Sequence, residues 1–188
     1  MDIELITAVA IGIGLSASAG FRVFIPMLVA AIAARAGILP LNDSFLWLSS
    51  WTAIACFGTA TVVEIMAYYI PFVDNLLDTI TTPLAVGAGT LLLTSVLPID
   101  NDLLKWLTGA AVGGGAAATV QGGSAITRLF STKLTAGVAN PVVATGENVA
   151  AIGTSLLSLV IPFFVVAGIL LLMIFIFTRL RKRPARQT

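Results

Sequence analysis

The chain has 188 residues, of which 58% are hydrophobic and only 10% are charged, and its mean hydropathy is +1.04. Soluble domains carry about 25% charged residues, so in water this chain would expose large apolar patches, and lipid is the solvent that its composition favours. The net charge of +1 gives no reason to expect a nucleic-acid partner. The chain has no histidine and one cysteine, Cys56, which excludes histidine-dependent catalysis and an intrachain disulfide.

The N-terminal segment is predicted to be a retained helix, because Asp2 and Glu4 stand where a signal peptide carries basic residues. Two apolar stretches, residues 5–21 and 23–34, are separated only by Arg22. They predict either one long broken helix or a hairpin that enters the membrane part of the way.

Four further stretches are long enough to span a membrane, whose hydrocarbon core takes about 20 apolar residues. They contain no charged residue and comprise residues 44–63, 79–99, 106–127 and 148–178. The last stretch is longer than one span, and Pro162 within it predicts a kink. The fold class is therefore predicted to be all-α, a polytopic transmembrane bundle of about six helices with broken or re-entrant segments.

The expected organisation is a single transmembrane domain, residues 1–178, followed by a basic tail, residues 179–188. Five of the ten basic residues lie in this tail. Positive residues beside a span stay on the cytoplasmic side of the membrane. The C-terminus is therefore predicted to be cytoplasmic.

A weak internal repeat links the two halves of the chain, because residues 14–20 resemble residues 113–119. Each segment is followed by an arginine, a proline turn and a long apolar stretch. This pattern is typical of secondary transporters with duplicated halves, here residues 3–98 and 103–178, whose sites form at the repeat interface. The alternative is that small residues simply recur, as they do in membrane bundles generally.

Small residues are spaced four apart in three series, which puts each series on one helix face. The series are Gly12, Ser16 and Gly20; Gly109, Gly113 and Ala117; and Gly114, Ala118 and Gly122. They predict close helix packing within the bundle, a substrate path lined by small residues, or a seam for a homo-oligomer or a larger membrane complex.

The acidic residues near Pro71 form one group of candidate substrate-binding residues. Glu64 precedes Pro71 by about two helical turns, which places it inside the membrane. A carboxylate there is unfavourable unless it is paired, protonated or hydrated, so Glu64 is either a proton or cation carrier or a structural partner of an arginine. Asp74 and Asp78 share a helix face and belong either to the same site or to the solvated interface.

Arg22 and Arg128 form a second group of candidates. Each lies within or beside an apolar segment. An arginine there either extends to the interface, pairs with a carboxylate such as Glu64, or binds an anionic ligand such as a lipid phosphate.

Asn140 and Glu147 complete the candidate substrate-binding residues. The Asn140–Pro141 pair predicts a turn, and Thr145 is predicted to cap a helix with Glu147 in its first turn. The sequence has no zinc, phosphate-loop or dinucleotide signature. We expect no cofactor, no metal, no catalytic residue and no enzymatic activity.

Together these positions resemble a bacterial membrane family known as a domain of unknown function, DUF4126. The resemblance covers residues 3–172 and is carried by Gly-Leu-Ser-Ala-Ser-Ala-Gly-Phe-Arg at residues 14–22, by Glu64 with Pro71, Asp74 and Asp78, and by Arg128, Asn140, Pro141 and Glu147. It implies a helical bundle in the bacterial cytoplasmic membrane and supplies no reaction.

The chain also departs from this family's pattern. Tyr68 and Tyr69 stand where members often carry an aspartate and a lysine, and a histidine and a lysine are frequent near Gln121 and Ser124. Asn148 replaces a frequent aspartate. If those groups carry a family activity, this chain has lost or altered it.

Three functions agree with these observations. The first is a small transporter or permease, open to proton coupling, with Glu64 and Arg22 at its site. The second is a lipid-binding or lipid-translocating protein whose arginines hold phosphate head groups. The third is a structural or accessory subunit of a membrane complex that docks through its glycine-rich faces.

Overall fold

A computed structural model describes residues 3–181, except for the side chains of Glu4 and of residues 71–76, 78–79, 175–177 and 179–181. This part of the chain is all-helical, with no strand, which confirms the predicted all-α class. In chain order its elements are α1 (Ile3–Ser18), α2 (Phe24–Arg35), the 3₁₀-helix η1 (Asp43–Ser49), α3 (Trp51–Ala67), α4 (Pro71–Thr94), α5 (Asp102–Thr108), the π-helix η2 (Gly109–Gly114), α6 (Gly115–Thr135), α7 (Asn140–Val160) and α8 (Pro162–Arg181).

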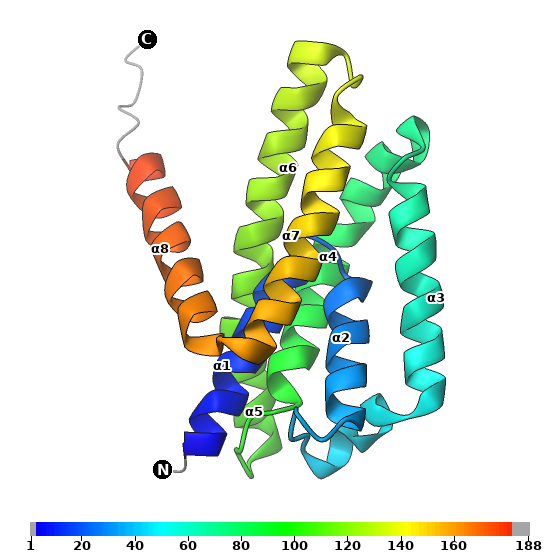
Figure 1. The fold of residues 1–188 in the computed structure, drawn as a ribbon. Helices are drawn as coiled ribbons and strands as arrows, with labels where there is room; N and C mark the ends of the chain where they lie inside the picture. Colours follow the sequence, from blue (N-terminus) through cyan, green and yellow to red (C-terminus); the bar gives the residue numbers. More distant parts are fainter. Residues whose placement is uncertain (1–2, 182–188) are drawn as a thin grey trace.

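Helices α1 and α2 form a hairpin whose turn lies inside the bundle, close to α6 and α7 (Figure 1). The turn can pack directly on α6 because residue 20 is glycine: a methyl group there would lie 2.5 Å from the carbonyl oxygen of Ala117. Arg22 in the turn is only 1% exposed. Of the two alternatives for residues 5–34, the structure shows the hairpin.

The predicted small-residue faces pack within the bundle. Ser16 of α1 donates a hydrogen bond to the carbonyl oxygen of Gly89 in α4 at 2.7 Å. A methyl group at Gly89 would lie 2.6 Å from the carbonyl oxygen of Gly113 in η2. These close backbone approaches hold α1, α4 and η2 together around a core that includes the buried side chains of Leu15 and Leu93. Gly122, by contrast, faces open space.

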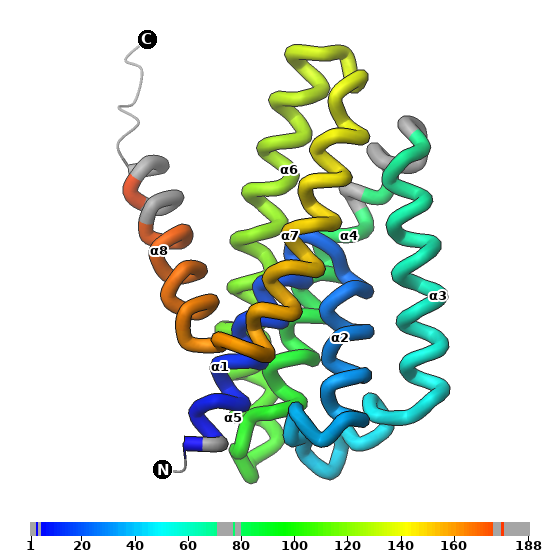
Figure 2. The backbone as a smooth tube through the Cα atoms, in the orientation of Figure 1, coloured from blue at the N-terminus to red at the C-terminus, as the bar shows by residue number. Residues whose placement is uncertain are grey.

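Helices α6 and α7 lie side by side and run in opposite directions, joined by a short connection at residues 136–139 (Figure 2). Helix α7 begins at Asn140, with Pro141 in its first turn, where the missing N–H of proline leaves no hydrogen bond unmade. Thr145 is therefore inside the helix, and its hydroxyl donates to the carbonyl oxygen of Pro141 at 2.8 Å. The predicted cap at Thr145 is wrong.

Pro162 divides the last apolar stretch as expected. Helix α7 ends at Val160 and α8 begins at Pro162, because proline cannot donate the hydrogen bond that would continue α7. Helix α8 leans away from the bundle at its far end (Figure 1). Two of the cavities described below are lined by residues of both α7 and α8.

Among the described residues, one helix, α7, is long and apolar enough to cross a membrane on its own. The pair η1 and α3 is bent by 61° and makes a second candidate if it is counted as one broken span. Four shorter segments are also apolar: Leu5–Ser18, Phe24–Arg35, Ile80–Thr94 and Pro162–Ile174. The number of membrane crossings stays a prediction.

Candidate functional site

A cluster of buried charged side chains forms where the turn between α1 and α2 meets α6 and α7. We call Arg22, Arg128 and Glu147 the charge cluster; they are 1%, 4% and 6% exposed. The carboxylate of Glu147 accepts from Nη1 of Arg22 at 2.9 Å, from Nε of Arg128 at 3.0 Å, and from Nη2 of Arg128. One carboxylate therefore bridges two guanidinium groups that lie far apart in sequence.

Helix α7 fixes the orientation of Arg22. Its Nε donates to Oδ1 of Asn148 at 2.6 Å, and its Nη2 donates to the carbonyl oxygen of Ala144 at 3.2 Å. Its Nη1 also donates to the carbonyl oxygen of Phe21 at 3.1 Å. With all three nitrogens bonded, Arg22 is a paired, buried arginine, which removes the alternative that it extends to the interface.

Polar and aromatic neighbours complete the environment of the charge cluster. The guanidinium carbons of Arg22 and Arg128 lie 3.7 and 4.2 Å from the ring centroid of Tyr68, as in cation–π contacts. Ser124 of α6 donates a hydrogen bond to Oε1 of Glu147. Tyr68, Ser124 and Asn148 were noted in the sequence only as departures from the family pattern. The structure places all three directly against the charge cluster.

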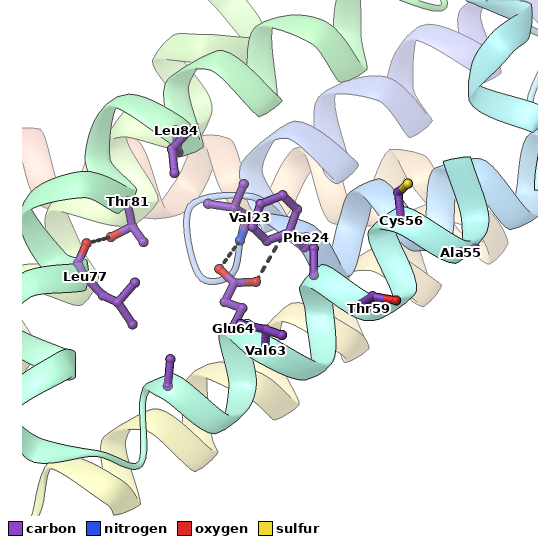
Figure 3. Close-up of a pocket in the computed structure, with 12 residues that line it drawn as sticks. Val23, Phe24, Ala55, Cys56, Thr59, Val63, Glu64, Leu77, Thr81 and Leu84 are labelled. Atoms are coloured by element: carbon purple, nitrogen blue, oxygen red, sulfur yellow. Dashed lines mark hydrogen bonds between the residues drawn. The ribbon is translucent and has the colours of Figure 1, made fainter. Parts of the chain in front are cut away.

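Glu64 of α3 is also buried, but it makes different hydrogen bonds (Figure 3). Its carboxylate accepts hydrogen bonds from the backbone N–H groups of Val23 at 2.8 Å and Phe24 at 3.0 Å. The residue before α2, Val23, provides no side-chain cap. Glu64 of α3 caps the N-terminus of α2 instead, and the dipole of α2 favours a negative charge at that end. An arginine partner was one of the two alternatives predicted for Glu64. In the described contacts its carboxylate forms this cap, and Glu147 is the carboxylate that pairs with Arg22 and Arg128.

Three cavities flank the buried polar groups. The first, of 590 Å³, lies between α3, α4 and the start of α2, and Glu64 and Thr81 are among its few polar lining residues (Figure 3). The second, of 510 Å³, lies between α6, α7 and α8 and is bordered by Ser124 and Glu147. The third, of 320 Å³, lies between α1, α7 and α8 and is mostly apolar. Of the charge cluster, Glu147 lines the second of these three cavities.

The remaining candidates lie elsewhere. Asn140 is at the start of α7, about two turns before Glu147, and its amide contacts Thr132 of α6 at 3.2 Å. The side chains of Asp74 and Asp78 and the tail residues 182–188 lie outside the described part of the chain. Within the described part, no three His, Cys, Asp or Glu side chains are grouped closely enough to hold a metal ion.

No curated protein and no solved structure matches this chain. The sequence model of a family described as a domain of unknown function, DUF4126, matches residues 9–182, which is nearly the whole chain. The chain therefore belongs to the DUF4126 family.

Proposed function

We propose that this chain is a small multi-pass membrane transporter whose solute-binding centre is the charge cluster of Arg22, Arg128 and Glu147. The observation that carries the proposal is the burial of three ionised side chains from separate segments beside a cavity. Ionisable groups inside a membrane are unfavourable, so they are uncommon there and mark solute or proton pathways.

The composition supports a membrane location for the whole bundle. Large apolar side chains are widely exposed, among them Leu134 at 82%, Val160 at 77% and Phe164 at 76%. Together with the mean hydropathy of +1.04, this exposure favours a lipid surrounding. The α1–α2 hairpin, whose turn carries Arg22 into the bundle, resembles the interrupted helices that form binding sites in transporters.

Uptake into liposomes tests the proposal. Purified wild-type chain is reconstituted, and uptake of radiolabelled small solutes is measured together with internal pH. Arg22→Lys keeps the positive charge but loses the planar set of donors that meets Glu147, Asn148 and Ala144, so its uptake should fall by about tenfold or more.

Arg35→Lys is the matched control for this assay. Arg35 lies outside the cluster, where its guanidinium stacks on Trp51 at 4.0 Å, and this variant should transport like the wild type. Equal uptake by all three proteins, or no uptake of any solute by the wild type, would contradict a transport role for the charge cluster.

A second candidate function is lipid binding, which the cavities favour. The cavity between α1, α7 and α8 is lined mainly by apolar side chains such as Leu157, Phe164 and Ile169. An apolar lining of this kind can hold an acyl chain, and an arginine can bind a phosphate head group through paired hydrogen bonds. Native mass spectrometry that finds no retained lipid in the wild type would argue against this candidate.

A further inference from the structure

We propose that the cavity between α2, α3 and α4 binds a single-chain amphiphile from the membrane, whose head group donates a hydrogen bond and carries no negative charge. The head group is a hydroxyl or an ammonium group and bonds to the carboxylate of Glu64, while the alkyl chain lies along the apolar wall. This site stands apart from the charge cluster and from the proposed transport function.

The cavity has the size and the lining of a site for an apolar ligand. Its volume of 590 Å³ lies within the range of about 300–1,000 Å³ that is usual for ligand sites. Its walls are mostly apolar and include Phe24, Val63 and Leu84 (Figure 3). Among the described residues that line it, Glu64 is the one that carries a charge. A ligand that fits this cavity is therefore mainly apolar, with one polar group directed at Glu64.

Glu64 can accept a further hydrogen bond from such a ligand. Its Oε1 accepts from the N–H of Val23 at 2.8 Å, and its Oε2 accepts from the N–H of Phe24 at 3.0 Å. An ionised carboxylate has about four acceptor positions, so these two bonds leave positions for a donor in the cavity. Glu64 is only 5% exposed, and a hydrogen bond made away from water is the stronger for it.

The charges around the cavity decide which head group fits. The sequence has no lysine or arginine between Arg35 and Lys105, the stretch that contains α3 and α4. Arg22 of the α1–α2 turn bonds to Glu147 and Asn148 of α7 and reaches the cavity's carboxylate only through longer-range attraction. A phosphate or carboxylate head group would therefore meet a like charge and no basic side chain in the wall. A hydroxyl or ammonium group meets an acceptor instead.

The cavity is open on the side that faces lipid. Its buried lining residues include Glu64 and Thr81, whereas Val63 and Leu84, which also line it, are 60% and 45% exposed. Exposed apolar side chains of this kind contact lipid in a membrane. An amphiphile dissolved in the bilayer can therefore enter between α3 and α4 without passing through water.

Photolabelling in vesicles tests the site. The wild-type chain is reconstituted in phosphatidylcholine vesicles with a diazirine derivative of tetradecanol, and the cross-linked residues are mapped by mass spectrometry. We expect saturable labelling of lining residues such as Ala60 and Thr81. Val62 is 57% exposed but does not line the cavity, so its labelling should rise in proportion to the probe concentration, as at any lipid-facing residue.

Competitors with the same alkyl chain identify the head group. In mildly alkaline buffer, unlabelled tetradecanol and tetradecylamine should reduce the labelling of Ala60 about tenfold more effectively than myristate and tetradecyl phosphate do. The alcohol and the amine donate a hydrogen bond to the Glu64 carboxylate, whereas the two anions are repelled by it. The better competitor of the first pair shows whether a hydroxyl or an ammonium group occupies the site.

Two variants locate the binding. Glu64→Gln turns one acceptor oxygen into a donor nitrogen, so the alcohol and the amine should lose their advantage over the two anions. Ala60→Phe keeps Glu64 and its bonds to α2 but places a ring in the cavity, so saturable labelling of Thr81 should disappear. Ala60→Phe and the competition in the wild type decide the question even if Glu64→Gln does not fold.

The contrary results are distinct. Labelling of the lining residues that does not saturate, or saturable labelling that persists in Ala60→Phe, overturns the site. Equal competition by all four amphiphiles, or stronger competition by the two anions, overturns the role of Glu64 in binding the head group. Neither result bears on the transport proposal, which is tested by uptake.

Discussion

Replacement of Glu147 by alanine is expected to lower the free energy of unfolding by about 3–5 kcal/mol, because it leaves two buried guanidinium groups without the carboxylate that bridges them. Arg22 and Arg128 are almost completely buried in the native chain, so the interaction that is lost is that of a desolvated ion pair. Denaturation of the purified chain in detergent micelles, followed by circular dichroism, measures the change.

Asp102→Asn is the matched control for this measurement. Asp102 also forms an ion pair, at 3.3 Å with Lys105, but its side chain is 84% exposed. Exposed pairs contribute less than about 1 kcal/mol. If Glu147→Ala and Asp102→Asn lower the free energy of unfolding by the same amount, the charge cluster is not the buried, tightly coupled group described above.

Gly113→Ala is expected to destabilise the chain by about 1–3 kcal/mol, although alanine is the better helix former. A methyl group at Gly113 would collide with the carbonyl oxygen of Gly89 and would lie 2.8 Å from Cβ of Leu93. Because one of these neighbours is backbone, α4 and η2 must move apart to admit it. The same denaturation experiment measures the effect.

Gly115→Ala tests whether close packing, rather than helix propensity, decides this result. Gly115 begins α6, two residues after Gly113, and a methyl group there would meet nothing within 4 Å. This variant should be as stable as the wild type or more stable, by up to about 1 kcal/mol. A loss of stability in both variants would contradict the packing of η2 on α4.

Much of the fold could be predicted from the sequence, because helix breaks have local causes. Proline removes a backbone donor, so the division at Pro162 and an interruption of the helix around Arg22 were both predicted, whereas the choice of a hairpin over a broken helix was left open. The predicted start of α7 was wrong because Thr145 and Pro141 are both typical of helix N-termini. Only the structure shows that the helix begins at Asn140, with Pro141 in its first turn. The predicted stretch 106–127 falls in the continuous run from α5 through η2 to α6. The π-helix within it was not predicted, because the close contacts of Gly109, Gly113 and Gly114 with α4 are visible only in the structure.

The candidate site was predicted residue by residue but not as an arrangement. Arg22, Arg128, Glu64 and Glu147 were all selected, because a charge in an apolar stretch is a local signal. Their pairing was not, because Arg22 and Glu147 are 125 residues apart in sequence and only helix packing brings them together. The contact of Tyr68 with two arginines could not be predicted from the sequence, because aromatic residues are common at helix ends.

Thiol labelling tests most directly the central claim that the charge cluster borders an open cavity. Cys56 is the only cysteine, so Cys56→Ser gives a background for single cysteines. Ser124→Cys places a thiol at a position that lines the 510 Å³ cavity. Ser155→Cys places one at a fully buried position of α7, where the serine forms a hydrogen bond with Ser18. We expect a water-soluble thiol reagent to label position 124 far faster than position 155. Equal rates at the two positions would contradict the claim.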